Sequence, residues 1–288
     1  MNRLYFALAL GSIVSSPSII AQTSTAADPT YTSVAKHPVK YTGQVYNIKP
    51  KLDIPLTALE TAWTLYGFSV VYNRDTVPYS ELASLNRNNI NSFDRGTSNN
   101  YSEKARAASD IFFGGSMAAP FFLLFDKRIR KDASKIGLLY LETLATTGTI
   151  YTICAMSANR FRPYSYNPDV PLAKRTRGGA RNSFFAGHVA IVGTTSFFFA
   201  GIYTSYHPEM KNKWWLYAVA SAATLTTGYL RIHAGQHFPT DVIVGTIVGP
   251  AVGILVPHFH KNKPMNSRLS FLPRFSQEQT GVTALYRL

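Results

Sequence analysis

Residues 214–257 read WWLYAVASAATLTTGYLRIHAGQHFPTDVIVGTIVGPAVGILVP, two apolar segments joined by a short polar turn. The apolar segments cover 214–230 and 242–257, close to the roughly 20 residues that cross a bilayer as a helix. Three glycines of the second segment recur every four residues, a spacing that lets helices approach closely in lipid; they are Gly245, Gly249 and Gly253. The stretch therefore predicts two membrane helices with a polar junction between them.

Four further apolar segments precede this stretch, at 54–72, 111–125, 136–159 and 188–206. Apolar residues make up 46% of the chain and charged residues only 15%, whereas about 25% charged residues is usual in a soluble protein. Segments of this length also fit the buried helices of a soluble all-helical protein, but the composition favours a membrane. The predicted fold class is all-α, a helical bundle with about five to six apolar, transmembrane helices.

The two ends of the chain differ from this helical part. Residues 1–21 combine Arg3, an apolar run and small residues, the pattern of a signal peptide or signal anchor. Residues 22–53 are polar and read as an extended segment. The helical domain then covers 54–260, and a tail follows at 261–288, whose alternating apolar residues around a Gln-Thr-Gly turn predict a short C-terminal β-hairpin.

Net charge and cysteine content narrow the kinds of partner. The formal net charge is +14, which favours an anionic partner. No run of consecutive basic residues resembles a nucleic-acid-binding arm, so phosphate at a membrane is the better interpretation. The single cysteine, Cys154, excludes a disulfide framework and a cysteine zinc site. We predict no metal, no cofactor, no nucleic acid and no protein partner.

Basic loops give an orientation. Five basic residues lie in 126–135 and two in 209–213, and short basic loops prefer the cytoplasm. Loops 160–187 and 231–241 then lie together on the opposite face. With this orientation, a cleaved signal would require that segment 54–72 does not span the membrane. An uncleaved signal anchor would instead add one crossing to the six apolar segments. Without a signal, six spans from a cytoplasmic N-terminus also fit.

Three polar clusters lie at the ends of apolar segments on that face: NRFRPY at 159–164, NSFFAGH at 182–188, and the junction 231–241. Arginines can clamp the oxygens of a phosphoryl group. A histidine can attack phosphorus when a carboxylate fixes its tautomer, and a second histidine can protonate the leaving oxygen. Free N–H groups at a helix start add an anion site. Together the clusters predict phosphoryl-transfer chemistry.

The order and spacing of these clusters resemble the type 2 phosphatidic acid phosphatase (PAP2) and vanadium haloperoxidase superfamily, and in particular its membrane lipid-phosphatase branch. The resemblance covers about 100–260. It rests on one motif from each cluster, namely Arg162-Pro163, then Gly187-His188, then Arg231-x5-His237-x3-Asp241. The third motif is the specific one, and the first two are weaker alone.

The resemblance implies a role for each matching residue and needs no metal. His237 would be the nucleophile, Asp241 its partner and His188 the general acid. The phosphate-binding residues would be Arg162, Arg231, the Gly187 amide and Arg160, which supplies a second arginine in the first motif.

Four positions depart from the family pattern. Ala155 stands where the family has lysine, Phe185 and Ala186 where it has proline and serine, and Leu230 where it has serine. One cationic and one hydroxyl contact to phosphate are therefore missing. Arg160 can replace part of the charge, and the other candidates in the same loop are Lys174, Arg175, Arg177 and Arg181.

The predicted function is metal-independent hydrolysis of a lipid-linked phosphate or pyrophosphate monoester through a phosphohistidine, at a bacterial inner membrane with the active site facing the periplasm. Candidate substrates are phosphatidate, phosphatidylglycerol phosphate, polyprenyl pyrophosphate and lipid A. Three alternatives remain: a soluble periplasmic acid phosphatase of the same fold, a vanadate-dependent haloperoxidase, and a catalytically weakened phospholipid-binding membrane protein.

Overall fold

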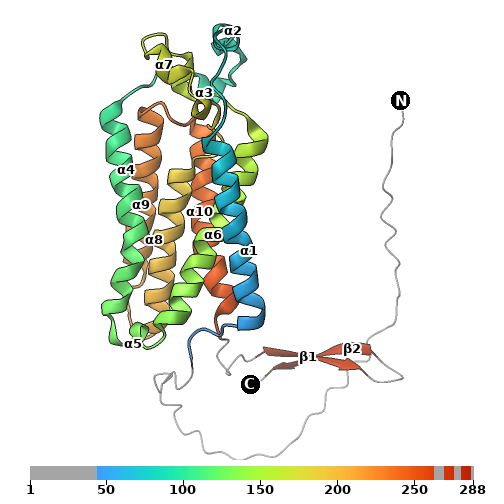
Figure 1. The fold of residues 1–288 in the computed structure, drawn as a ribbon. Coiled ribbons are helices and arrows are strands. Elements are labelled where there is room, and N and C mark those ends of the chain that lie inside the picture. The colour runs from blue at the N-terminus through green and yellow to red at the C-terminus, as the bar shows by residue number, and fades with distance from the viewer. Residues whose placement is uncertain (1–43, 263–268, 276–279, 287–288) are drawn as a thin grey trace, which may run out of the picture. The chain divides into compact units, whose positions relative to one another are not determined.

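The computed structural model describes residues 44–262, 269–275 and 280–286 (Figure 1). Each of the six apolar segments lies in a long helix, so the predicted all-α bundle is confirmed. The helices are α1 (Pro50–Tyr72), α4 (Glu103–Ala118) with its 3-10 continuation η2 (Ala119–Phe125), α6 (Ala133–Ala158), α8 (Gly187–Tyr206), α9 (Trp214–His233) and α10 (Pro239–His260). Helix α8 is central, because it packs against α4, α6, α9 and α10, while α1 packs along α6.

Short helices occupy the two ends of the bundle. At the end where α1 finishes and α8 begins lie α2 (Tyr79–Ala83), η1 (Arg87–Asn89), α3 (Ser92–Arg95), η3 (Pro163–Tyr166), α7 (Leu172–Arg175) and η4 (Gly178–Arg181). Helix α5 (Lys127–Arg130) lies at the other end (Figure 1). The loops that carry the three polar clusters thus meet at one end, as predicted.

Local sequence explains where several helices begin and end. Ser102 caps α4 by accepting a hydrogen bond from the amide of Ala105 at 3.2 Å. Pro239 occupies the first turn of α10, where a missing N–H costs nothing. Helix α6 ends at Asn159, which has a left-handed backbone (φ 40°) that asparagine tolerates. These signals fix the helix ends that carry the polar clusters.

The glycines of α10 let it lie directly on α8, which confirms the close approach expected from their spacing. A Cβ added to Gly245 would lie 2.7 Å from the carbonyl oxygen of Ala186. One added to Gly249 would lie 2.8 Å from Cα of Ala190. Gly253 meets the backbone of Thr194 in the same way. Helices α8 and α10 therefore make contact through backbone atoms over three turns.

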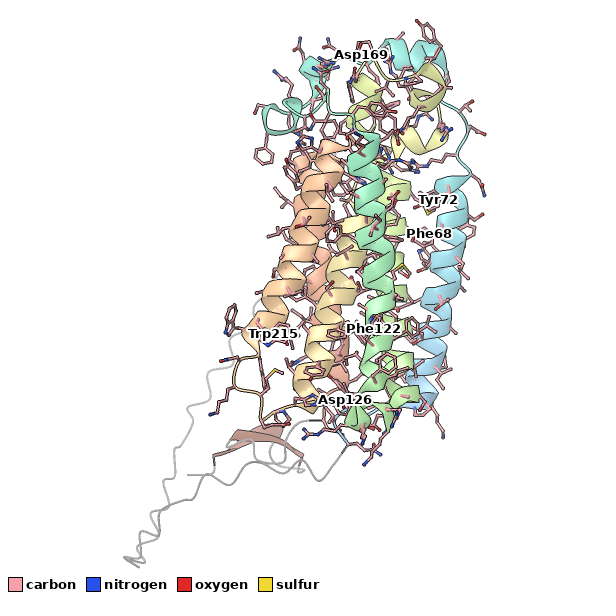
Figure 2. All side chains as sticks on the ribbon, turned by 90° about the vertical axis from the view of Figure 1, so that its left-hand side faces the viewer. Phe68, Tyr72, Phe122, Asp126, Asp169 and Trp215 are labelled. Atoms are coloured by element: carbon pink, nitrogen blue, oxygen red, sulfur yellow. The ribbon has the colours of Figure 1, made fainter. Side chains whose placement is uncertain are left out.

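Apolar side chains cover the outside of the bundle. Phe122 is 62% exposed and Trp215 is 45% exposed, and both project outward (Figure 2). Within the described residues, three helices are long and apolar enough to cross a membrane by length and composition: Glu103–Phe125, Gly187–Tyr206 and Pro239–His260. Large apolar groups on the outside are costly in water and favourable in lipid.

The tail forms the predicted hairpin, but Thr280 and Gly281, which were expected in the turn, belong to the second strand. Strands β1 (Leu269–Phe275) and β2 (Thr280–Tyr286) pair antiparallel, with Leu269 opposite Tyr286. The predicted signal at 1–21 lies outside the described residues. The extended segment predicted for 22–53 ends earlier than expected, because α1 already begins at Pro50, a residue type suited to a first helical turn.

Candidate active site

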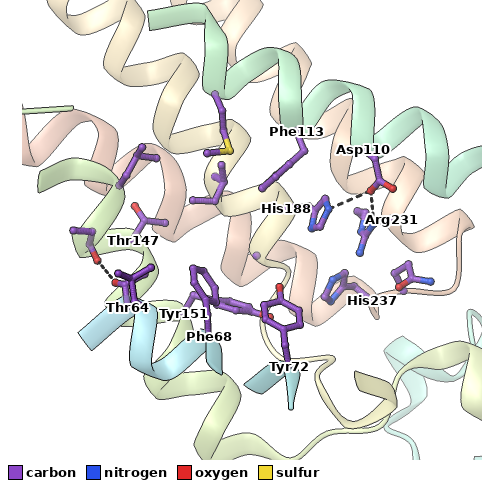
Figure 3. A pocket seen from close by; sticks show the side chains of 18 of the residues that line it. Thr64, Phe68, Tyr72, Asp110, Phe113, Thr147, Tyr151, His188, Arg231 and His237 are labelled. Atoms are coloured by element: carbon purple, nitrogen blue, oxygen red, sulfur yellow. Dashed lines mark hydrogen bonds and ion pairs between the residues drawn. The ribbon is translucent and has the colours of Figure 1, made fainter. Parts of the chain in front are cut away.

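A cavity of about 600 Å³ lies between α1, α4, α6 and α8 and the end of α9 (Figure 3). Five of the seven predicted site residues line it: Arg162, Gly187, His188, Arg231 and His237. Most of the remaining wall is apolar and includes Leu65, Phe68, Phe113, Met117, Leu141 and Ile191. The structure therefore joins a polar, basic pocket to an apolar chamber within one cavity.

His237 is almost completely buried, and its tautomer follows from its neighbour. The ring Nδ1 lies 2.6 Å from the backbone carbonyl oxygen of Ser183. Because a carbonyl only accepts, Nδ1 carries the hydrogen and Nε2 keeps a free lone pair. Burial, reinforced by the charges of Arg162 and Arg231, holds the pKa of His237 well below its ordinary value. The neutral ring is thus a competent nucleophile.

Asp241 does not contact His237, contrary to the expectation that it would be the direct partner of the ring. Its carboxylate accepts from Ser183 Oγ at 2.6 Å and from the amide of Phe238 at 2.9 Å, and it forms an ion pair with Arg160. The reason is its position in the first turn of α10, where a carboxylate caps its own helix. Ser183 therefore lies between Asp241 and His237, with its hydroxyl on the carboxylate and its carbonyl on the ring, and the sequence interpretation gave this residue no role.

Arg160, which was expected to bind phosphate, does not line the described cavity and is instead paired with carboxylates. It forms ion pairs with Asp241 and, at 2.7 Å, with Asp94 of α3, and it donates to Thr240 Oγ1 at 2.9 Å. Its guanidinium also lies 4.6 Å from the ring centroid of Phe238. Arg160 is absent from the cavity wall as described. Two fully buried carboxylates hold it, because an unpaired buried charge is very unfavourable.

Burial alone would raise the pKa of the Asp94 carboxyl. Hydrogen bonds from Thr240, Asn91 and Arg160 outweigh that effect and lower the pKa. Asp94 thus remains ionised and ties α3 to the start of α10, directly behind the site.

Two arginines leave donors available to an anion. Arg162 donates to the carbonyl oxygen of Gly179 at 2.9 Å and to Gln236 Oε1 at 2.8 Å. Arg231 donates to Ser109 Oγ at 3.3 Å, while its buried Nε has no hydrogen-bond partner among the described residues. A buried guanidinium with an unmet donor in a cavity is well suited to bind phosphate.

Gly187 begins α8, so the first amides of that helix face the polar pocket with the positive end of the helix dipole. A Cβ at this position would lie 2.8 Å from the ring of Tyr151. The close contact explains why a glycine stands here.

Helix α4 contributes two cavity residues that the sequence interpretation missed, Arg106 and Asp110. Asp110 Oδ1 lies 3.2 Å from His188 Nε2 and 3.4 Å from Arg231 Nη1 (Figure 3). The predicted segment began at residue 111, whereas the helix begins at Glu103. One signal in the sequence could have identified them: Arg106 and Asp110 are four residues apart, a spacing that places both side chains on one face of a helix.

Two of the four positions that depart from the family pattern lie in the same apolar cluster. Ala155 and Phe185 are buried in one apolar cluster with Val71 and Tyr151. The rings of Tyr151 and Phe185 meet edge to face at 5.6 Å. A large side chain at 185 thus accompanies a small one at 155. The four basic residues proposed as substitutes do not line the described cavity; these are Lys174, Arg175, Arg177 and Arg181.

Comparison with known proteins gives three matches. Residues 136–265 match the model of the PAP2 superfamily. A stretch of 147 residues, 50% of this chain, is 31% identical to the lipid A 4'-phosphatase of Porphyromonas gingivalis and spans 57% of that protein's length. The crystal structure of a transmembrane PAP2-type phosphatidylglycerolphosphate phosphatase from Bacillus subtilis aligns with a TM-score of 0.38 at 20% identity, covering 73% of this chain and 92% of that one.

Proposed function

We propose that this chain, whose residues 136–265 belong to the PAP2 superfamily, is a membrane phosphatase that hydrolyses a lipid-linked phosphate or pyrophosphate monoester. One observation carries the proposal. Two histidines, two arginines and a helix start surround one end of a cavity whose other end is apolar. Such a cavity suits an amphiphile, with its phosphate at the basic end and its chain in the apolar chamber.

The proposed reaction has two steps and needs no metal ion. In the first, His237 Nε2 attacks phosphorus, the P–N bond forms and the bond to the leaving oxygen breaks, while His188 gives that oxygen a proton. In the second, His188 takes a proton from water, the water oxygen bonds to phosphorus, and the P–N bond breaks to release inorganic phosphate. Arg162, Arg231 and the Gly187 amide would stabilise the charge on the equatorial oxygens in both steps.

Ser183 and Asp241 would orient the nucleophile. The Ser183 carbonyl keeps the hydrogen of His237 on Nδ1, so that Nε2 is free to attack. The hydrogen bond from Ser183 Oγ to the buried carboxylate of Asp241 fixes that carbonyl in turn. In this proposal a serine takes the place of the direct carboxylate contact implied by the family pattern.

Lipid A is the substrate to test first, because the relative from Porphyromonas gingivalis is named for that activity. Phosphatidate, phosphatidylglycerol phosphate and polyprenyl pyrophosphate remain the other candidates. The three share a phosphate monoester or terminal phosphate on an apolar chain, which the cavity suits equally well.

We also propose an inner-membrane location with the site facing the periplasm. Helix α5 carries the basic residues Lys127, Arg128 and Arg130 at the end of the bundle away from the site, and basic loops favour the cytoplasm. Since α1 runs along α6 and starts at that same end, this orientation places residue 50 on the cytoplasmic side. It therefore favours six spans over a cleaved signal.

The test is phosphate release from a panel of lipid phosphates by the detergent-solubilised protein in EDTA, with His237→Ala as the matched variant. We expect release from at least one lipid and its loss in His237→Ala. Turnover that persists in the variant would remove the phosphohistidine mechanism. Lipid binding without turnover in either protein would favour the phospholipid-binding alternative, which the loss of phosphate contacts at Ala155 and Ala186 motivates.

A further inference from the structure

Asp110 of α4 belongs to none of the three sequence motifs, yet its side chain lines the cavity. It extends from the middle of α4 into the cavity, where its Oδ1 bridges His188 Nε2 at 3.2 Å and Arg231 Nη1 at 3.4 Å. Among the residues described as lining the cavity, it is the one carboxylate. Its contact with His188 is direct, whereas the carboxylate of Asp241 is directed to a serine.

The His188 ring is held on a second side by Phe113, whose ring centroid lies 4.4 Å away. Phe113 and Asp110 lie three residues apart on α4, so one face of that helix packs the ring and bonds its Nε2. This leaves Nδ1 as the nitrogen available to a leaving oxygen. The orientation of the ring is thus set from α4.

The charged surroundings make a carboxylate important for a general acid. The charged and titratable side chains that share the cavity with His188 come from α1, α4, α6, α9 and the loops: Tyr72, Arg106, Asp110, Tyr151, Arg162, Arg231 and His237. Three guanidiniums repel an imidazolium. A general acid must nevertheless carry a proton when the leaving oxygen departs, and a carboxylate on Nε2 favours that protonated form.

We propose that Asp110 is the positioning residue of the general acid: it orients His188 through Nε2 and stabilises its protonated form, so that Nδ1–H can protonate the leaving oxygen. This inference rests on the proposed phosphatase function. The transferred proton belongs to His188.

The test compares two phosphate monoesters that differ in their need for an acid. Dodecyl phosphate has an alkoxide leaving group that requires a proton, whereas 4-nitrophenolate leaves from 4-nitrophenyl phosphate without one. For Asp110→Asn we expect kcat/KM, which reports the step in which the leaving group departs, to fall by about 10²-fold on dodecyl phosphate, the size of a lost general acid, and by less than tenfold on 4-nitrophenyl phosphate. The alkaline limb of the kcat/KM profile on dodecyl phosphate should also move to lower pH.

Three further variants separate this role from a structural one. Asp169→Asn changes an exposed carboxylate at the same end of the bundle and should match the wild type. Ser109→Ala removes a contact to Arg231 without touching His188 and should affect both esters equally. Asp110→Glu keeps the negative charge and should restore the position of the alkaline limb. We expect this result even if Asp110→Asn melts at a lower temperature than the wild type.

Equal losses on the two esters in Asp110→Asn, with an unmoved alkaline limb, would overturn the inference. So would a further loss that is larger on dodecyl phosphate than on 4-nitrophenyl phosphate when Asp110→Asn is added to His188→Asn, because an effect that passes through His188 disappears without it, whereas an effect through Arg231 lowers both rates equally. Wild-type protein that cleaves neither ester nor any lipid phosphate would instead refute the proposed function itself.

Discussion

Gly249→Ala tests the contact on which the spacing of the two histidines depends. The added methyl carbon would lie 2.8 Å from Cα of Ala190 in α8, whereas carbon atoms in contact sit about 3.5–4.0 Å apart. Helices α8 and α10 must therefore separate by roughly 1 Å. His188 lies in the first turn of α8 and His237 lies two residues before α10, so the separation moves one histidine away from the other.

Two opposing effects determine how much Gly249→Ala changes the free energy of unfolding. Overpacking costs about 1–3 kcal/mol, and replacing glycine by alanine within a helix returns about 0.5–1 kcal/mol. The net loss is about 0–2.5 kcal/mol of stability, or a melting temperature lower by up to about 10 °C. A misplacement of about 1 Å between catalytic groups can lower the rate by about 10²-fold, although Gly249 lies eight residues beyond Asp241 and touches no substrate.

Thermal melting and phosphate release, measured in one detergent, give both quantities. Gly201→Ala is the matched control, because it lies in α8 and its added Cβ would meet no atom within 4 Å. It should melt at or slightly above the wild-type temperature with unchanged kcat. If Gly249→Ala melts and turns over like Gly201→Ala, the backbone contact between α8 and α10 does not set the geometry of the site.

Three other substitutions test the site. In the proposed mechanism neutral His237 is the nucleophile, and its pKa lies well below the ordinary value near 6.5. We therefore expect kcat/KM to hold as the pH falls past 6.5 and to decline only at a lower pH. Arg162→Gln removes a repelling charge, which should move that decline to higher pH in a pH–rate profile. Ser183→Ala removes a donor from the buried Asp241 carboxylate, and we expect kcat to fall by tenfold or more with little change in KM, together with a lower melting temperature; a change confined to KM would contradict this. Ala155→Lys restores the family residue type at a position only 1% exposed in an apolar cluster, and should lower the melting temperature without raising the rate, whereas a faster stable variant would refute the packing explanation.

Hydrophobic length and helix-end signals were sufficient to predict the bundle. Six apolar segments correspond to six long helices, because an apolar run of this length has few other ways to satisfy its backbone in lipid. Proline and glycine placed the ends near the polar clusters, and those ends meet at one cavity. The glycine spacing in 245–253 predicted a close helix contact, although it did not identify α8 as the neighbour.

Tertiary partners account for what the sequence did not reveal. Arg160 is paired with Asp94, which lies 66 positions away in the chain, and no local pattern indicates that contact. The spacing of Asp241 suits both a contact with the ring of His237 and the capping of its own helix. Because the Ser183 carbonyl already occupies Nδ1 of His237, Asp241 caps the helix. Asp110 escaped notice because polar residues before an apolar run also fit a loop.

The loss of lysine at position 155 does not leave the cavity short of positive charge. Arg106 enters from α4, and its ion-pair partner Glu103 is itself paired with Lys174. Three guanidiniums, those of Arg106, Arg162 and Arg231, then balance Asp110 and a phosphate dianion. A proton on His188 is the single charge in excess, and it is the charge that the proposed reaction delivers to the leaving oxygen. Where Ala155 of α6 supplies no charge, Arg106 of α4 thus supplies one, 4.0 Å from Asp110, the carboxylate proposed to position the acid.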